Sequence, residues 1–193
     1  MRKCLSGDPS FAAVQTLITE YNSYRTGHAE FSMGGGIETH EAAMRILKDF
    51  KWFLEQPDLT KIYWAQYSDP EVFFDKYVDR CGIITTDGHR KASFNAFRIY
   101  GDMPVERKRL VCAVPGVDGM ASADSRRAAL VLWNETDEEK EIAVEFQGVS
   151  FHRGNFKLYR IDKEHASFLD NSDSERLEAA EYKTNVDTAT FSW

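Results

Sequence analysis

The chain has 193 residues, of which 42% are hydrophobic and 13% aromatic, and its formal net charge is −7. This apolar content argues against a disordered chain and suffices for one medium domain or two small ones. The basic residues are scattered, with short clusters only at 107–109 and 126–127, which speaks against a nucleic-acid-binding face. No apolar run reaches the length that spans a bilayer, so we expect no membrane contact.

The sequence gives no sign of a metal or disulfide framework. Its three cysteines, Cys4, Cys81 and Cys112, lie far apart and are odd in number. Neither they nor the five histidines show the spacing of zinc ligands. We therefore expect no metal and no cofactor, and the cysteine usage fits a reducing compartment.

The first predicted elements alternate between strand and helix. Residues 14–19 form an apolar run that predicts a buried strand, and residues 38–55 carry apolar side chains at helical spacing, with Thr39 as N-cap. Residues 61–67 predict a second strand, apolar on both faces, and residues 91–100 predict a second helix. This alternation predicts two β/α units with parallel strands within residues 1–104.

After Pro104 the pattern changes to short alternating strands with polar turns. The segments 109–114, 128–133, 141–146 and 156–161 are the strand candidates. We therefore predict a second domain, residues 105–193, built as an antiparallel sheet or half of a β-sandwich.

Glu20 follows the first predicted strand directly. A carboxylate at the carboxyl end of a parallel barrel strand lies where such barrels build active sites. Retaining glycoside hydrolysis uses one carboxylate as nucleophile and a second as acid/base. From spacing alone, the competing interpretation is a solvent-facing glutamate just past a strand.

The segment Thr19-Glu20-Tyr21-Asn22-Ser23, placed after an apolar strand, resembles the nucleophile segment of glycoside hydrolase family 39, the family of β-xylosidases and α-L-iduronidases. Residues 62–69 are similar to the last barrel strand of that family, and residues 82–97 to its last loop and helix. The resemblance implies the last two β/α units of a (β/α)8 barrel, followed by an antiparallel β-sandwich domain. It also implies that Glu20 is the catalytic nucleophile.

The same resemblance implies further substrate-binding residues. Trp64, near the end of the second strand, is a candidate floor for a sugar ring, because an aromatic face can pack on the apolar face of a pyranose. A barrel-core tryptophan is the equally open alternative. The remaining candidate pocket residues are Tyr21, Asn22, Tyr24 and Asp69.

One part of the family pattern is absent. The acid/base glutamate of the family lies in an Asn-Glu-Pro-like motif, and the only Asn-Glu here, Asn134-Glu135, is followed by Thr136 in a polar turn. We therefore expect the chain to be the C-terminal portion of a retaining glycosidase acting on a β-xyloside-like carbohydrate, weak or inactive by itself. The expected partners are an N-terminal barrel chain or a second copy. The alternative is a non-catalytic carbohydrate-binding or structural β-sandwich module.

Overall fold

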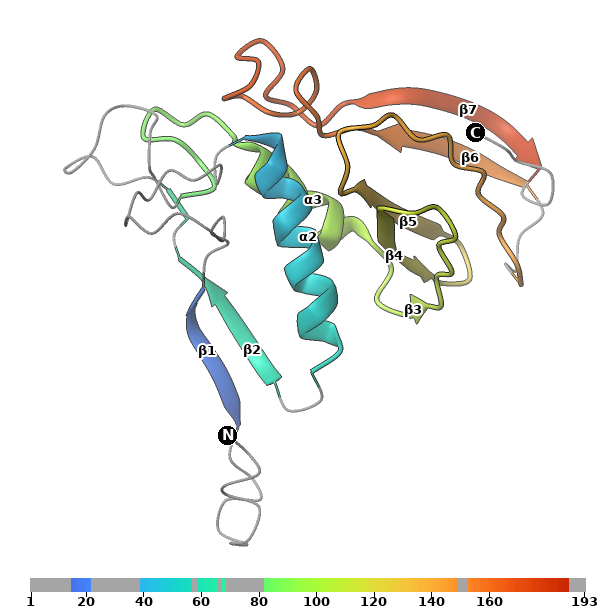
Figure 1. Ribbon diagram of the computed structural model, residues 1–193, viewed down its shortest axis with the longest axis horizontal. Coiled ribbons are helices and arrows are strands. Elements are labelled where there is room, and N and C mark those ends of the chain that lie inside the picture. Colours follow the sequence, from blue (N-terminus) through green and yellow to red (C-terminus); the bar gives the residue numbers. More distant parts are fainter. Residues whose placement is uncertain are drawn as a thin grey trace, which may run out of the picture.

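A computed structural model describes residues 15–21, 39–56, 59–65, 67–68, 82–148 and 153–187. Its first half contains strand β1 (Thr16–Tyr21), helix α2 (His40–Leu54), strand β2 (Leu59–Trp64) and helix α3 (Ala92–Asp102). β1 and β2 pair in parallel, as expected for consecutive strands joined through a helix (Figure 1). The two strands and two helices lie within two residues of the predicted starts.

Helix α2 forms because its apolar residues recur on one face. Ala42, Ala43, Ile46 and Leu47 are buried, and Glu41 in the first turn and Lys51 in the last turn match the helix dipole. Thr39 is the N-cap residue, but its side chain makes no capping hydrogen bond. The backbone carbonyl of Thr39 accepts from the Ala42 amide instead, at 2.9 Å.

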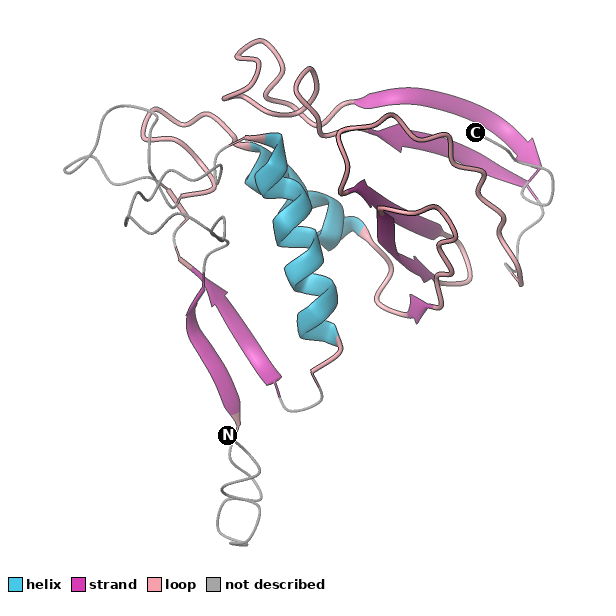
Figure 2. Cartoon of the chain, viewed as in Figure 1, coloured by secondary structure: helices cyan, strands magenta, loops and turns pink. Residues whose placement is uncertain are grey.

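The second half is antiparallel (Figure 2). Strands β3 (Arg107–Lys108), β4 (Val117–Ala123) and β5 (Ala128–Asn134) form one sheet in that order. Strands β6 (Arg153–Tyr159) and β7 (Ala179–Asp187) form a two-stranded sheet of their own.

Two predicted strands of this half are wrong, and three observed strands, β3, β4 and β7, were not predicted. Residues 109–114 and 141–146 have no regular structure, whereas β4 and β7 are rich in small and polar residues and carry little strand signal. Gly119 explains why β4 pairs despite its composition. A Cβ at this position would lie 2.2 Å from the Val131 carbonyl oxygen, so only glycine permits the observed approach of β4 to β5.

The halves share one hydrophobic core. It joins residues of α2 and α3 with Met120 of β4 and Trp133 of β5. Lys51 of α2 also pairs with Asp118 of β4 at 2.6 Å. Within the described ranges β1 and β2 pair only with each other, so the two parallel strands do not close a barrel.

Candidate functional site

The carboxyl ends of β1 and β2 lie side by side, because the strands are parallel and Tyr21 pairs with Trp64. Glu20 is the penultimate residue of β1. The strand order therefore brings Glu20, Tyr21 and Trp64 to one end of the sheet, where parallel α/β folds place their ligands.

The two faces of this sheet differ. Its paired residues Ile18 with Ile62 and Tyr21 with Trp64 are half-buried, and both aromatic side chains lie toward the helices. The other face exposes its side chains, and we call it the helix-free face. It consists of Leu17, Thr19, Glu20, Lys61 and Tyr63.

A register irregularity sets the direction of Glu20. The pairing shifts between Ile18 and Tyr21, so three residue steps separate two side chains that face the helices. A β-bulge of this kind places two consecutive residues, here Thr19 and Glu20, on the same side, and both are exposed. The carboxylate of Glu20 is thereby directed away from α2 and α3.

Tyr21 takes the opposite direction. Its hydroxyl donates a hydrogen bond to the Asp49 carboxylate of α2, and its ring packs edge-on against Phe53 with centroids 4.9 Å apart. Its carbonyl oxygen accepts from the Ala65 amide at 2.9 Å. These contacts hold the residue that follows Glu20, whereas a sugar on the helix-free face would lie on the other side of the sheet.

Trp64 also packs toward the helices. Its ring contacts Phe97 of α3 edge-on, with centroids 5.1 Å apart, and Tyr21 at 5.7 Å. Its Nε1 is buried and has no hydrogen-bond partner among the described residues. These contacts favour the core interpretation of Trp64 over the sugar platform, two alternatives that the sequence left equally open.

The other predicted pocket residues, Asn22, Tyr24 and Asp69, lie outside the described residues. Asp49 was not predicted, since an aspartate inside a helical pattern ordinarily faces solvent. The sequence gives one indication that Asp49 faces the sheet. It lies between Ile46 and Phe53 on the same side of the helix.

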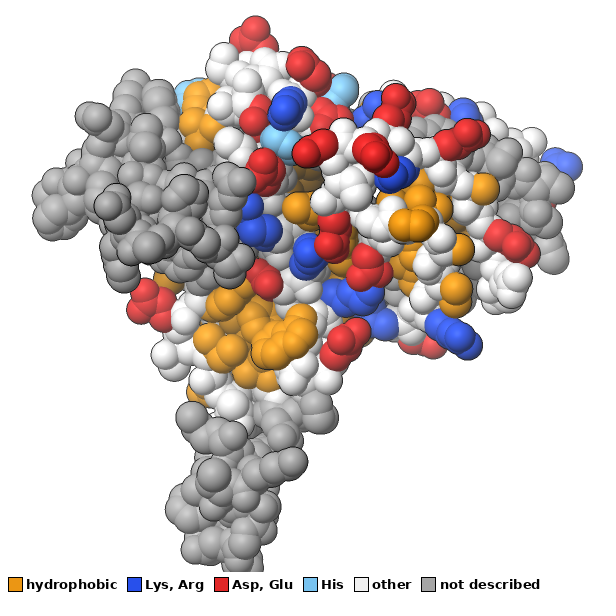
Figure 3. All heavy atoms as spheres, in the orientation of Figure 1, with side chains coloured by type: hydrophobic (Ala, Val, Ile, Leu, Met, Phe, Trp, Pro, Cys, Tyr) orange, Lys and Arg blue, Asp and Glu red, His pale blue; other side chains and the backbone are white. Residues whose placement is uncertain are grey.

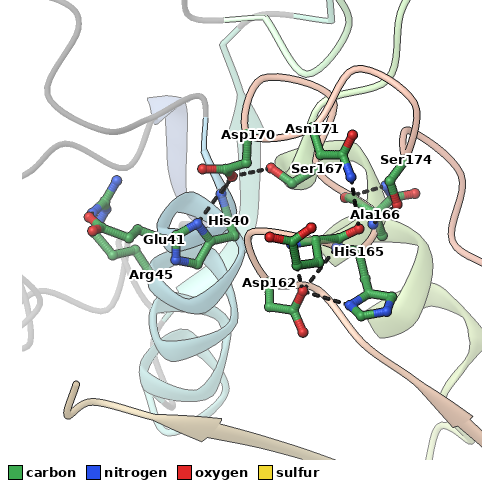
Figure 4. A network of polar contacts seen from close by, with 12 residues as sticks. His40, Glu41, Arg45, Asp162, His165, Ala166, Ser167, Asp170, Asn171 and Ser174 are labelled. Carbon is green, nitrogen blue, oxygen red and sulfur yellow. Dashed lines mark hydrogen bonds and ion pairs between the residues drawn. The ribbon is translucent and has the colours of Figure 1, made fainter. Parts of the chain in front are cut away.

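A second polar cluster ties the loop after β6 to the helices (Figure 4). Asp170 accepts hydrogen bonds from the backbone amide of His40, at 2.6 Å, and from the Ser167 hydroxyl, and it contacts His40 Nδ1 at 3.1 Å. The carboxylate lies between the serine and the histidine, so the Ser167 hydroxyl donates to Asp170 and not to an imidazole, and Ser167 is fully buried. This cluster secures the first turn of α2 instead of forming a nucleophile.

A neighbouring contact fastens the same loop to the segment before α3. His89 Nδ1 lies 2.8 Å from Glu175, and the His89 ring stacks on Phe168 with centroids 4.0 Å apart. Asn95, fully buried in α3, donates to the carbonyl oxygens of Ala166 and Glu175 at 2.8 and 2.9 Å. His89 is thus part of the contact between the halves.

Asn134-Glu135 forms the turn that the sequence predicts. Asn134 Oδ1 accepts from the Thr136 amide at 3.0 Å, and Glu135 pairs with Lys48 of α2 at 2.9 Å. Glu135 therefore has a structural partner. Across the described ranges, no three potential metal ligands come together, and no helix is long and apolar enough to cross a membrane.

The chain is similar in fold to two solved β-xylosidases. One is a GH39 β-xylosidase from Caulobacter crescentus, with a TM-score of 0.59 and 17% identity, matched over 87% of this chain and 41% of its own. The other is a monomeric β-xylosidase from Caulobacter crescentus CB15, with a TM-score of 0.66 and 16% identity, matched over 98% of this chain and 44% of its own. At these identities the likeness shows the fold, and this chain spans less than half the length of either protein.

Comparison of the sequence with known families and proteins does not detect this similarity. No family model matches the chain, and no curated protein matches it. The fold nevertheless agrees with the resemblance to glycoside hydrolase family 39 that the order of the sequence segments indicates.

Proposed function

We propose that this chain is the C-terminal portion of a retaining glycoside hydrolase that acts on β-xyloside-like substrates, with Glu20 as its nucleophile. The observation that carries the proposal is the direction of Glu20. Its carboxylate lies at the carboxyl end of a parallel strand, on the face opposite the described helices α2 and α3. The fold likeness to two β-xylosidases supports the same assignment.

The chemistry follows from one exposed carboxylate. The Glu20 carboxylate attacks the anomeric carbon and forms a glycosyl ester while the bond to the leaving oxygen breaks. A second carboxyl group protonates that oxygen and then deprotonates the water that cleaves the ester, which restores the original configuration. These steps need no metal and no cofactor.

The second carboxyl group must come from outside this chain in our proposal. Glu135, in the only Asn-Glu of the sequence, is paired with Lys48 in a turn after β5. An N-terminal β/α segment would supply the acid/base and the remaining barrel strands. The isolated chain should therefore hydrolyse aryl xylosides slowly or not at all.

Trapping with an activated 2-deoxy-2-fluoro-xyloside tests the proposal. The fluorine slows breakdown of the ester, and an activated leaving group departs without protonation, so the missing acid does not prevent labelling. Peptide mapping should place the adduct on Glu20. Glu20→Gln should abolish labelling, and Glu55→Gln, which changes an exposed glutamate at the end of α2, should leave it intact.

Two outcomes would contradict the proposal. An adduct on another carboxylate would show that Glu20 is not the nucleophile. Reversible sugar binding without any adduct would favour the non-catalytic carbohydrate-binding module instead.

A further inference from the structure

We propose that the loop between β6 and β7, residues 162–178, positions the proposed active site from the second half of the chain. We call this segment the bridging loop. It holds the start of α2 and the segment before α3, and through them it fixes the carboxyl ends of β1 and β2. The contacts of the loop stand without the function proposed above, and only their effect on the chemistry of Glu20 rests on it.

The bridging loop lies at the end of the molecule that carries Glu20. In a parallel β/α unit the helix begins at the carboxyl end of the strand before it, so α2 and α3 start at the end where β1 and β2 finish. Figure 1 shows the bridging loop over the starts of both helices. In Figure 3 acidic side chains and histidines gather at this same end. A segment of the second half therefore reaches the end of the first half where a substrate would bind.

The first contact of the bridging loop fixes the start of α2. Asp170 accepts a hydrogen bond from the His40 backbone amide at 2.6 Å, and its side chain is only 13% exposed. Thr39, the N-cap residue, makes no capping hydrogen bond with its own side chain. A carboxylate at a helix start satisfies a free amide and opposes the positive end of the helix dipole. Asp170 thus supplies the cap that the sequence next to α2 does not provide.

Helix α2 links this contact to Glu20. Asp49, further along the same helix, accepts the hydroxyl hydrogen bond of Tyr21, and Tyr21 follows Glu20 directly. The backbone hydrogen bonds of a helix keep it stiff, so a displacement at its start is transmitted to its later turns. A shift of α2 at Asp170 therefore moves the strand residue beside the proposed nucleophile.

The second contact of the bridging loop leads to the end of β2. Glu175 lies 2.8 Å from His89 Nδ1. The His89 amide donates to Thr85 Oγ1 at 2.9 Å, and the Thr85 amide donates to the His89 carbonyl oxygen at 2.8 Å. The amides of residues 83 and 84 donate to the carbonyl oxygen of Tyr67, just after β2, at 3.1 and 3.2 Å. A continuous series of contacts therefore runs from the bridging loop to the carboxyl end of β2.

The conformation of the bridging loop is itself fixed. Ala166 has a φ of 54°, in the left-handed region that residues other than glycine seldom adopt, and it is buried. Its carbonyl oxygen accepts from Asn95 of α3 at 2.8 Å, and its amide donates to Ser174 Oγ at 3.1 Å. A residue in such a conformation persists only where its surroundings determine it. The loop is thus held in one conformation against α3, as a positioning element requires.

Labelling kinetics with the activated 2-deoxy-2-fluoro-xyloside test the proposal. Asp170→Ala should lower the maximal rate of Glu20 labelling at least about tenfold, because a small misplacement of a reacting group is costly. The fluoro-xyloside concentration that gives half of the maximal rate should change less than about twofold, since Asp170 acts through α2 and not on the sugar. Asp170→Asn keeps an oxygen for the His40 amide and should retain most of the rate. Asp173→Ala, which changes an exposed aspartate of the same loop, is the matched control and should label like the wild type.

A purely stabilising role of the loop gives a different result. Asp170→Ala would then lower the urea midpoint, while the labelling rate of the folded protein stayed at the wild-type value, and that outcome would overturn the proposal. Circular dichroism and cooperative urea unfolding establish that each variant is folded under the labelling conditions. Glu175→Ala and Glu175→Gln repeat the comparison at the second contact, which keeps the test decisive where Asp170→Ala does not fold.

Hydrogen exchange separates this inference from the proposed function. In Asp170→Ala the amides of β1 should exchange at least about tenfold faster than in Asp173→Ala, while those of β4 stay at the wild-type rate, which a global loss of stability would not allow. Faster exchange in β1, together with a wild type that is never labelled, would refute the nucleophile assignment and leave the positioning contact standing. A labelled wild type whose exchange and labelling rates are unchanged in Asp170→Ala and Glu175→Ala would refute the positioning role alone.

Discussion

The two faces of the β1–β2 sheet differ in what their residues do. The face toward α2 and α3 holds Tyr21 and Trp64 in ring contacts and a hydrogen bond, so its side chains contribute to stability. The helix-free face leaves Leu17, Glu20 and Tyr63 exposed, so its side chains contribute little to the fold. Neighbouring residues of one strand thus differ in burial, since Tyr21 packs against the helices and Glu20 is exposed.

The largest expected effect distinguishes the core from the helix-free face. Ile46, fully buried in α2, lies in the core that both halves share. Ile46→Ala should lower the free energy of unfolding by about 2–5 kcal/mol, because it leaves a cavity. Leu17→Ala should cost less than about 1 kcal/mol, since that side chain is already hydrated. Urea unfolding at a concentration where the chain is monomeric measures both, and equal losses would contradict the comparison.

A smaller effect separates two tyrosines on opposite faces. Tyr21→Phe removes the hydrogen bond to the half-buried Asp49 carboxylate and should cost about 1–2 kcal/mol. Tyr63→Phe, the matched change on the helix-free face, should alter the unfolding free energy by less than about 0.5 kcal/mol. If Tyr63→Phe were the more destabilising of the two, the assignment of the faces would be reversed.

The smallest effect concerns the junction of the halves. Burial by itself raises the pKa of Asp118, but hydrogen bonds from Lys51 and the Gly119 amide outweigh it, so the pKa is lowered from its usual 3.8. A carboxylate with a lowered folded-state pKa stabilises the fold above the unfolded value, and this contribution is lost as pH falls through the folded value.

Lys51→Met should therefore raise the pKa of Asp118 and remove part of the acid dependence of stability below about pH 4. Because both side chains are partly exposed, the stability change at pH 7 should stay within about 1 kcal/mol. Carboxyl NMR titration and urea unfolding at several pH values measure the two quantities. An unchanged Asp118 pKa in Lys51→Met would show that the pair does not form in solution.

The sequence predicts the β/α half well and the antiparallel half poorly. Ile46, Leu47 and their neighbours repeat at helical spacing, and short apolar stretches at 17–18 and 62–65 mark the two strands, so local pattern suffices there. β4 pairs because Gly119 permits a close backbone approach, which is a tertiary property that composition does not reveal. Segment 141–146 alternates like a strand but has no regular structure.

The candidate site is predictable to a similar extent. The position of Glu20 after a strand follows from the sequence. Its direction depends on a register shift between Ile18 and Tyr21, and that of Tyr21 on a contact with Asp49, 28 positions away. Long-range contacts of this kind leave no periodic signal in the chain.

Carboxyl footprinting tests the central claim most directly. Carbodiimide coupling to an amine, on protein dilute enough to be monomeric, compares Glu20 with Asp49 in one digest. We predict rapid modification of Glu20, which faces away from the helices, and slow modification of Asp49, whose carboxylate accepts the Tyr21 hydroxyl. A protected Glu20 beside a freely modified Asp49 would contradict the two-faced sheet on which the proposed nucleophile depends.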